Sequence, residues 1–204
     1  MAIHQGEHGE AAIDGRTARA LRTHDAIVDA CLALVDEGDL QPTAPRVAER
    51  AGVSVRSVFQ HFDDLDGLFS AVGDRVLERL VGLVLSVEPD LDFERRVPIV
   101  VRQRAALLEA ITPIRRATNI NAWNSKEVIR RLKLGHEFLR AEVATAFTHE
   151  LAAAGADRQQ VLDAIDTVLS WANWEHLRST VGLEPEPSMA IVERLLRAVL
   201  APYR

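Results

Sequence analysis

The residues best suited to chemistry lie in one short segment, 54–61, which is mostly polar and carries a single long cation. Arg56 and Gln60 stand four residues apart, so they share one face if the segment is helical. The forked donors of Arg match the edge of guanine in the major groove of DNA, and the amide of Gln matches adenine. The pair therefore predicts direct reading of DNA bases, provided that other elements hold the segment away from the body of the protein.

The elements that would hold this segment are two short helices and a tight turn within residues 43–62. Thr43 is the expected N-cap of the first helix, and Pro45 falls in its first turn, where a missing N–H costs nothing. Gly52 suits the positive φ that reverses the chain, and Ser54 is the expected N-cap of the second helix. This layout predicts a helix-turn-helix. Its small core is expected from Val47, Ala48, Val53, Val58 and Phe62, which leaves Val55, Arg56, Ser57, Phe59, Gln60 and His61 facing elsewhere.

Apolar residues keep helical spacing through the rest of the chain, and no segment alternates like a half-buried strand. We expect a first helix from Thr17 to the turn at Gly38, and a long fourth helix that Asp64 caps and that runs to about Pro89. The predicted fold class is all-α, with a disordered arm at 1–15, a three-helix helix-turn-helix domain at 16–63 and a helical body at 64–204. Further helices are expected at 91–111, 113–120, 125–154, 157–181 and 187–201, with breaks at Pro113, Asn119–Asn124, Gly155 and Gly182–Pro187.

The charge of the chain argues against a protein that coats nucleic acid regardless of sequence. The 204 residues have a formal net charge of −6, and the first 62 residues hold six arginines and nine acids. Non-specific binding depends on neutralising phosphates, so DNA binding by this chain would have to be local and geometric.

Composition also predicts the cellular compartment. Cys31 is the only cysteine, and its apolar neighbours predict a buried thiol, which fits a reducing cytosol. The amino terminus lacks the apolar core of a signal peptide, and the longest apolar stretch, Val81–Val87, is too short to span a bilayer. We expect a cytoplasmic protein without membrane insertion.

The sequence lacks the motifs of catalysis and cofactor binding. It contains no phosphate-binding glycine loop, no His-Glu-x-x-His, no Cys-x-x-Cys and no Gly-x-Ser-x-Gly. His4, Glu7 and His8 could chelate a metal on a helix, but a disordered tail is the preferred interpretation. We expect no enzyme activity, no metal and no cofactor.

Residues 51–62, AGVSVRSVFQHF, resemble the recognition segment of the tetracycline-repressor (TetR) family, which reads approximately A-G-V-S-x-G-T-L-Y-x-H-F. The resemblance covers residues 17–87 through the order and lengths of four helices, and the remainder only through helix count. It implies that Val55, Arg56 and Gln60 lie nearest to base edges, at the helix that Ser54 begins. It also implies contacts to the DNA backbone from Thr43, Ser57, Phe59 and His61.

Three further positions bear on contact with the DNA backbone. Arg22, like the arginines before it, either contacts phosphate as the arm docks or belongs to a solvated arm, and both alternatives stay open. The family usually has Tyr where Phe59 stands, so a phosphate-binding hydroxyl is lost. It usually has Lys where Leu65 stands. Both departures predict weaker backbone contact than is usual in the family.

A small-molecule effector would bind in the carboxy-terminal body. Trp123, His136, Phe138 and Trp171 could converge on a mostly apolar pocket with few polar anchors. The alternative is that these side chains only fill the core.

The last two predicted helices resemble the pair that forms the dimer in the family. Each carries an apolar stripe, and pairing them about a two-fold axis would give a four-helix bundle and place two recognition helices on a palindromic site. The alternative is that the stripes cover the core of their own subunit. The predicted interface consists of Trp174, Leu177, Arg178, Val181, Ile191, Leu195, Ala198 and Val199.

The resemblance implies a sequence-specific transcriptional regulator whose partners are a double-stranded DNA operator, a second copy of the chain and an unidentified small-molecule effector. Repression with release by the effector is the predicted mode, while activation and co-repression stay open. The alternative is an all-α ligand carrier or enzyme with an incidental helix-turn-helix. The acidic charge and the two departures favour that alternative, and the lack of a convergent acid, base or metal set argues against it.

Overall fold

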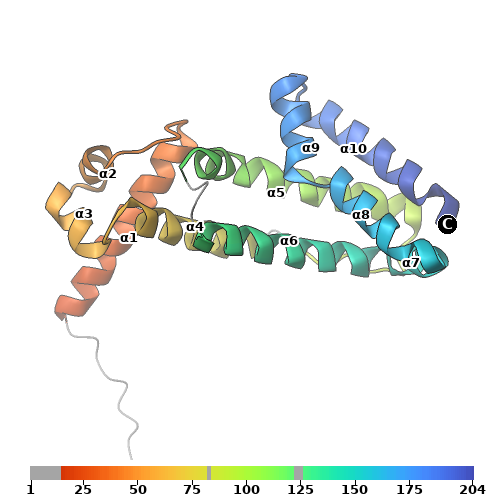
Figure 1. The fold of residues 1–204 in the computed structure, drawn as a ribbon, viewed down its shortest axis with the longest axis horizontal. Helices are drawn as coiled ribbons and strands as arrows, with labels where there is room; N and C mark the ends of the chain where they lie inside the picture. The colour runs from red at the N-terminus through yellow and green to blue at the C-terminus, as the bar shows by residue number, and fades with distance from the viewer. Residues whose placement is uncertain (1–14, 82–83, 122–125) are drawn as a thin grey trace, which may run out of the picture.

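A computed structural model describes residues 15–81, 84–121 and 126–204, and every regular element in these three ranges is helical. The predicted all-α class is confirmed. Figure 1 shows α1 to α3 at one end of an elongated molecule, with α4 running from them toward the body formed by α5 to α10. No helix within the described ranges combines the length and the hydropathy needed to cross a bilayer. The helices of the first part are α1 (Gly15–Asp36), α2 (Ala44–Ala51), α3 (Val55–His61) and α4 (Leu65–Val81).

The arm predicted at 1–15 falls almost wholly outside the described residues, as does the possible metal-binding set in it. Only Gly15 is described, and it is the first residue of α1.

The helix-turn-helix forms as its local sequence predicts. Gly52 adopts φ 67° and ψ 32°, the left-handed region that glycine enters without a Cβ penalty, and it ends α2. Ser54 caps α3, because its hydroxyl accepts a hydrogen bond from the Ser57 N–H at 3.1 Å. The predicted core is confirmed, with Val47, Ala48, Val58 and Phe62 buried and Val53 half-buried against them.

Helices α1 and α4 complete the core beneath the helix-turn-helix. Ile27 and Cys31 on α1 and Leu68 and Val72 on α4 are all fully buried in this cluster. Burial raises the pKa of the Cys31 thiol to about 12, and the negative charge of Asp39 adds to the effect. The thiol therefore stays protonated at neutral pH, and its predicted burial is confirmed.

The fourth helix is shorter than predicted. Asp64 caps it by accepting a backbone N–H at 2.8 Å, but the described residues that follow Val81, 84–88, are not helical. The prediction of a helix to Pro89 is wrong because the chain leaves helical geometry in this connection, where Val87 packs against the core of the body.

The body has its own core, built mainly by α5, α8 and α10. Phe147, Ile165, Trp174 and Leu196 are among its buried side chains. Figure 1 shows α10 lying along one side of α5. The elements of this part are α5 (Phe93–Asn121), α6 (Lys126–Ala146), α7 (Thr148–Ala153), η1 (Gly155–Asp157), α8 (Arg158–Val168), α9 (Trp171–Glu175), the π-helical turn η2 (His176–Thr180), α10 (Pro185–Leu200) and η3 (Ala201–Tyr203).

Helix α5 runs through Pro113, where a break was expected, so the predicted boundary is wrong. A proline inside a helix removes one hydrogen bond, and tertiary contacts beyond it must offset that loss. Here Ile114 packs against the amino-terminal core and Ala117 is 1% exposed. The part of α5 beyond the proline is thereby held in place.

Two other predicted helices are divided. The helix predicted at 125–154 breaks at Phe147, whose backbone leaves helical geometry (φ −111°, ψ 32°) while its ring is fully buried. The helix predicted at 157–181 breaks before Ser170, which caps α9 by accepting the Asn173 N–H at 3.1 Å. Core packing and a local cap decide these breaks, which helical spacing alone does not reveal.

A buried ion pair joins the start of α5 to α7. Arg96 and Glu150 are 3% and 5% exposed, and the guanidinium donates both to the Glu150 carboxylate and to the Pro89 carbonyl. The Phe147 ring lies 5.5 Å from the guanidinium carbon. Arg96 therefore fixes the end of the connection that leads from α4 into the body.

Candidate functional site

The predicted DNA-reading face is an exposed surface on α3. Val55 is 39% exposed and Phe59 50% exposed, and Arg56 and Gln60 are also exposed. On the opposite side of the helix, Val58 is 1% exposed and anchors α3 to its core. Figure 1 places α3 at the outer end of the molecule, away from the body. A short helix held by one side and exposed on the other has the geometry that entry into a major groove requires.

The residues predicted to contact the DNA backbone border this face. Thr43 and Arg22 are exposed, and Ser57 and His61 are half-buried. Thr43 precedes α2 as predicted, but its hydroxyl makes no capping hydrogen bond, so the expected side-chain cap is wrong. The proline in the first turn of α2 has already removed one of the N–H groups that such a cap would satisfy.

Ion pairs within the chain engage at least four of the six described acids among residues 1–62. The excess of acids noted in the sequence therefore weighs less against DNA binding than their number suggests. Arg22 and Arg56 make no ion pair with any described residue, so both cations remain available for another partner. The pairs are Arg46 with Asp39 (2.5 Å), Arg50 with Glu37 (2.9 Å), and Arg75 with Asp25 (2.8 Å) and Asp29 (2.6 Å).

Arginines also attach α4 to its neighbours on two sides. The Arg75 pairs link α4 to α1. From the other side, Arg131 on α6 donates to the Ser70 carbonyl and pairs with Asp74 at 2.8 Å. A Cβ on Gly73 would lie 3.4 Å from the Arg131 guanidinium, an ordinary contact distance, so this side chain lies directly against α4. Helix α4 is thus held by both the DNA-binding end and the body.

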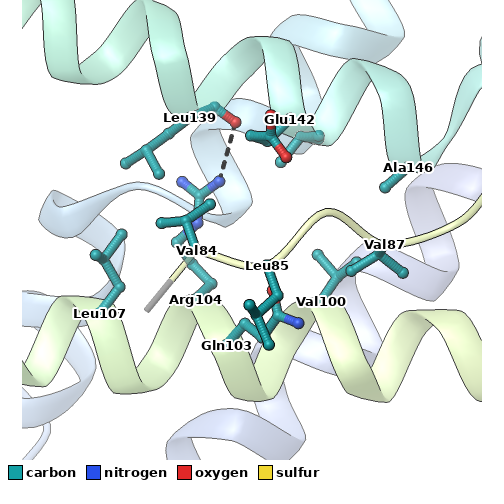
Figure 2. Close-up of a pocket in the computed structure, with 11 residues that line it drawn as sticks. Val84, Leu85, Val87, Val100, Gln103, Arg104, Leu107, Leu139, Glu142 and Ala146 are labelled. Atoms are coloured by element: carbon teal, nitrogen blue, oxygen red, sulfur yellow. Dashed lines mark hydrogen bonds between the residues drawn. The ribbon is translucent and has the colours of Figure 1, made fainter. Parts of the chain in front are cut away.

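A pocket lies in the body between α5, α6 and the connection that follows α4 (Figure 2). The space between its walls is about 400 Å³ when the open solvent at its mouth is included. The walls are mostly apolar, and Figure 2 shows Arg104 extending from α5 toward the Leu139 carbonyl of α6. The lining residues are Val84, Leu85, Val87, Val100, Gln103, Arg104, Leu107, Leu139, Glu142, Val143 and Ala146.

None of the residues predicted to bind an effector lines this pocket, and their role in binding one stays a prediction. Trp123 lies outside the described residues. His136 is 53% exposed and faces Asp166 at 3.3 Å, and Phe138 is 48% exposed. Trp171 instead hydrogen bonds to a threonine hydroxyl of α5 at 3.1 Å. Positions 136 and 138 point to different sides of one helix, so they could not line one pocket together.

Several residues predicted at the dimer interface belong to the subunit itself. Trp174 and Leu177 are 2% and 7% exposed in the core of this chain, so the alternative interpretation holds for these two. Arg178 is half-buried and donates to Glu109 at 2.9 Å, and Val199 packs partly against the same core. Their side chains are already engaged inside the subunit.

The other predicted interface residues form an exposed apolar strip on α10 and just before it. Val181 is 52% exposed, Ile191 37% and Leu195 41%, and Ala198 is also exposed. Ile191, Leu195 and Ala198 follow at spacings of four and three, so they share one face of α10. The buried residues of α10, Val192, Leu196 and Leu200, lie on a different side of the helix, and α10 packs on α5 and α8.

Two arginines that the sequence analysis missed contribute to the site. Arg104 stands within the apolar stripe of α5 that Val97, Val101 and Leu108 form. A cation at such a position could have predicted that a polar group enters the core. Arg131 gave no signal, because its partner Asp74 is 57 residues away in the chain.

Comparison with known proteins agrees with this geometry. Residues 27–72 match the family model for bacterial regulatory proteins of the tetR family. A crystal structure described as a TetR-family transcriptional regulator from Mesorhizobium loti is 22% identical with a TM-score of 0.68, over 91% of this chain and 98% of that one. A transcriptional regulator from Rhodococcus sp. Rha1 is 16% identical with a TM-score of 0.63, over 90% of this chain and 96% of that one. No curated protein matches the sequence.

The solved structures share the fold along nearly the whole chain, and the family model covers the part that contains the helix-turn-helix and the start of α4. The alternative of a carrier or enzyme with an incidental helix-turn-helix is not favoured, because the matched residues are those that build and present α3. Residues 27–72 thus form a helix-turn-helix domain similar to that of bacterial regulatory proteins of the tetR family, and this domain supports a role as a DNA-binding transcriptional regulator.

Proposed function

We propose that this regulator is a repressor that binds a palindromic operator as a homodimer and leaves it when a small molecule enters the pocket of the body. The observation that carries the proposal is the position of one pocket wall. Val84, Leu85 and Val87 line the pocket and belong to the connection that follows α4. A molecule that enters the pocket would push on the same stretch of chain that positions α4.

The DNA-binding part of the proposal rests on the exposed face of α3. Arg56 and Gln60 supply donors and acceptors for base edges, and the free hydroxyl of Thr43 suits a phosphate oxygen. Two copies of α3 related by a two-fold axis would read the two halves of a palindrome.

A gel-shift titration tests whether the protein recognises a specific sequence. The chain should bind a duplex from the region upstream of its own gene with a saturable band, and the affinity should fall steeply as salt rises. A random duplex of the same length is the control. Equal affinity for the two duplexes at every salt concentration would contradict the proposal, and a promoter-reporter assay distinguishes repression from activation.

The coupling part rests on the attachments of α4. Movement of α4 would alter its ion pairs with α1 through Arg75, and α1 supports the helix-turn-helix. On the body side, Arg131 transmits displacement of α6, which also lines the pocket. Coupling between two sites is typically about 1–3 kcal/mol, which corresponds to roughly 5–150-fold in operator affinity.

Replacing Arg131 by Met should loosen α4 from the body. The change removes an ion pair with Asp74 and a hydrogen bond to a backbone carbonyl, both partly exposed, so local opening of α4 should become about threefold to tenfold more frequent. Hydrogen exchange of the amides of residues 70–78 measures this opening. The control is Lys133→Met, which removes an exposed cation that faces Glu137 at 3.9 Å on the same helix. Equal exchange in both variants would show that Arg131 does not hold α4.

The proposal of a homodimer is supported by the exposed strip on α10. Ile191, Leu195 and Ala198 present an apolar face that the subunit itself leaves uncovered. Two such faces packed about a two-fold axis would bury apolar surface from both copies.

Leu195→Glu should dissociate the dimer. A carboxylate placed in an apolar interface costs about 2–4 kcal/mol, so the dissociation constant should rise by about thirtyfold or more. Sedimentation velocity over a concentration series measures the change. Leu134→Glu makes the same substitution at a leucine of α6 that is 51% exposed, and it should leave the dimer intact. A wild-type protein that is monomeric at micromolar concentration would refute the two-fold arrangement.

A further inference from the structure

The pocket of the body contains an arginine without a carboxylate partner. Arg104 lies on α5 and donates to two neutral backbone carbonyls, that of Leu139 at 3.2 Å and that of Leu169 at 3.5 Å. It forms no ion pair within the part of the chain that the structure describes. The acid whose charge acts on it, Asp166, already lies 3.3 Å from both Arg140 and His136.

The charge of Arg104 is therefore poorly compensated in its surroundings. Burial lowers the pKa of the Arg104 guanidinium to about 10, against the opposing effect of Asp166. The group remains a cation at neutral pH. A guanidinium has five N–H donors in a planar fork that matches a carboxylate, and the hydrogen bonds to Leu139 and Leu169 use only two of its nitrogen atoms.

The rest of the pocket is suited to hydrocarbon. Val100, Leu107 and Val143 form its inner wall together with the apolar side chains of the connection after α4. Figure 2 shows Leu107 and Val100 on either side of Arg104, each about one turn from it along α5. A ligand with one polar end and one apolar part would satisfy both features of this pocket.

A second charged residue limits the charge of such a ligand. Glu142 lines the pocket and accepts a hydrogen bond from the Ser86 hydroxyl at 3.1 Å. Its carboxylate repels a second negative charge on the ligand. The combination favours a molecule with a single negative charge over a dianion such as a phosphate monoester.

We propose that this pocket binds a small apolar monocarboxylate, with its carboxylate on the Arg104 guanidinium and its hydrocarbon part against Val100, Leu107 and Val143. This ligand class deepens the proposed function, since the carboxylate would be the effector that releases the operator.

Calorimetric titration of the full chain with hexanoate, octanoate, decanoate and 4-phenylbutyrate tests the proposal, with the corresponding primary amides as neutral isosteres. At least one acid should bind about tenfold more tightly than its amide, because only the acid forms a charge-assisted pair with Arg104. Arg104→Gln should bring this ratio close to one while the amide still binds. Glu142→Gln should tighten binding of the acid severalfold and leave the amide unchanged.

Three outcomes would overturn the ligand class: no binding of any of these acids, equal binding of acid and amide, or an acid-to-amide ratio that Arg104→Gln does not change. If Arg104→Gln fails to fold, the Glu142→Gln result decides, and weaker or unchanged binding of the acid overturns the proposal. A gel shift with the bound acid separates the two proposals. If an acid binds through Arg104 but leaves the operator complex intact, the proposed release by an effector is refuted and the binding site is not. If only compounds without a carboxylate release the operator, the proposed ligand class is refuted.

Discussion

Replacing Glu150 by Ala should lower the free energy of unfolding by about 3–5 kcal/mol, the largest loss that we expect from a single change outside the apolar core. Glu150 and Arg96 are almost completely buried, and the Arg96 guanidinium depends on this carboxylate and on one carbonyl for its partners. Removing the carboxylate leaves a buried cation without a counter-charge. Removing one partner of a buried ion pair costs far more stability than the intact pair contributes, because the desolvation of the remaining charge is no longer offset.

A double variant separates charge from packing in this result. Arg96→Met with Glu150→Leu removes both charges and keeps apolar volume, so it should recover most of the stability that either single change loses. Urea unfolding at a fixed protein concentration measures all three, because association also contributes to stability. The matched control is Asp90→Ala, which removes an exposed ion pair with His149 of 2.9 Å and should change stability by less than about 1 kcal/mol. If the double variant is as unstable as the sum of the single variants, lost packing rather than an unpaired charge explains the effect.

Arg56→Ala should weaken operator binding by about 1–3 kcal/mol, roughly fivefold to 150-fold, while affinity for random DNA changes much less. Arg56 is the only long cation on α3, it is exposed, and it makes no ion pair with the described residues. Its fork can reach the edge of a guanine, and the loss of that contact should relax the sequence preference at one position of each half-site.

Arg22→Ala serves as the contrast to Arg56→Ala. Arg22 lies exposed on α1, where we expect a phosphate contact, so its loss should weaken the operator and random DNA alike and reduce the salt slope by about one. Fluorescence anisotropy with both duplexes over a salt series distinguishes the two variants by specificity. Both should keep the wild-type melting temperature, because neither side chain is buried. An unchanged ratio of operator to random affinity in Arg56→Ala, or an unfolded domain, would refute base readout by this residue.

The helix-turn-helix was predictable because its determinants act over short distances. The Gly52 turn and the Ser54 cap each depend on hydrogen bonds between residues at most five positions apart. The core contributed by Val58 and Phe62 repeats with helical spacing, so the buried and exposed sides of α3 follow from the local sequence. Local preference and tertiary packing agree here, which is why the fold class and the helix-turn-helix were both predicted correctly.

In the body the same reasoning predicted helices but not their ends or their neighbours. Pro113 predicted a break, yet contacts of Ile114 with the other core keep α5 continuous. Phe147 predicted no break, yet its burial between α6 and α7 creates one. Each outcome depends on surfaces that come together only when the chain has folded, and helical spacing carries no information about them.

By itself, the sequence determined an all-α chain with a helix-turn-helix whose outer face carries Arg56, since caps, turns and apolar spacing are local properties. Only the tertiary structure decided that Trp174 fills the subunit core while Leu195 stays exposed, although both lie on apolar stripes. It also decided which arginines form ion pairs with acids of the same chain. Arg104 lies in the pocket and forms no ion pair with a described residue. The physical reason is that charge pairing and pocket walls join residues far apart in sequence, so their geometry exists only after the helices have packed.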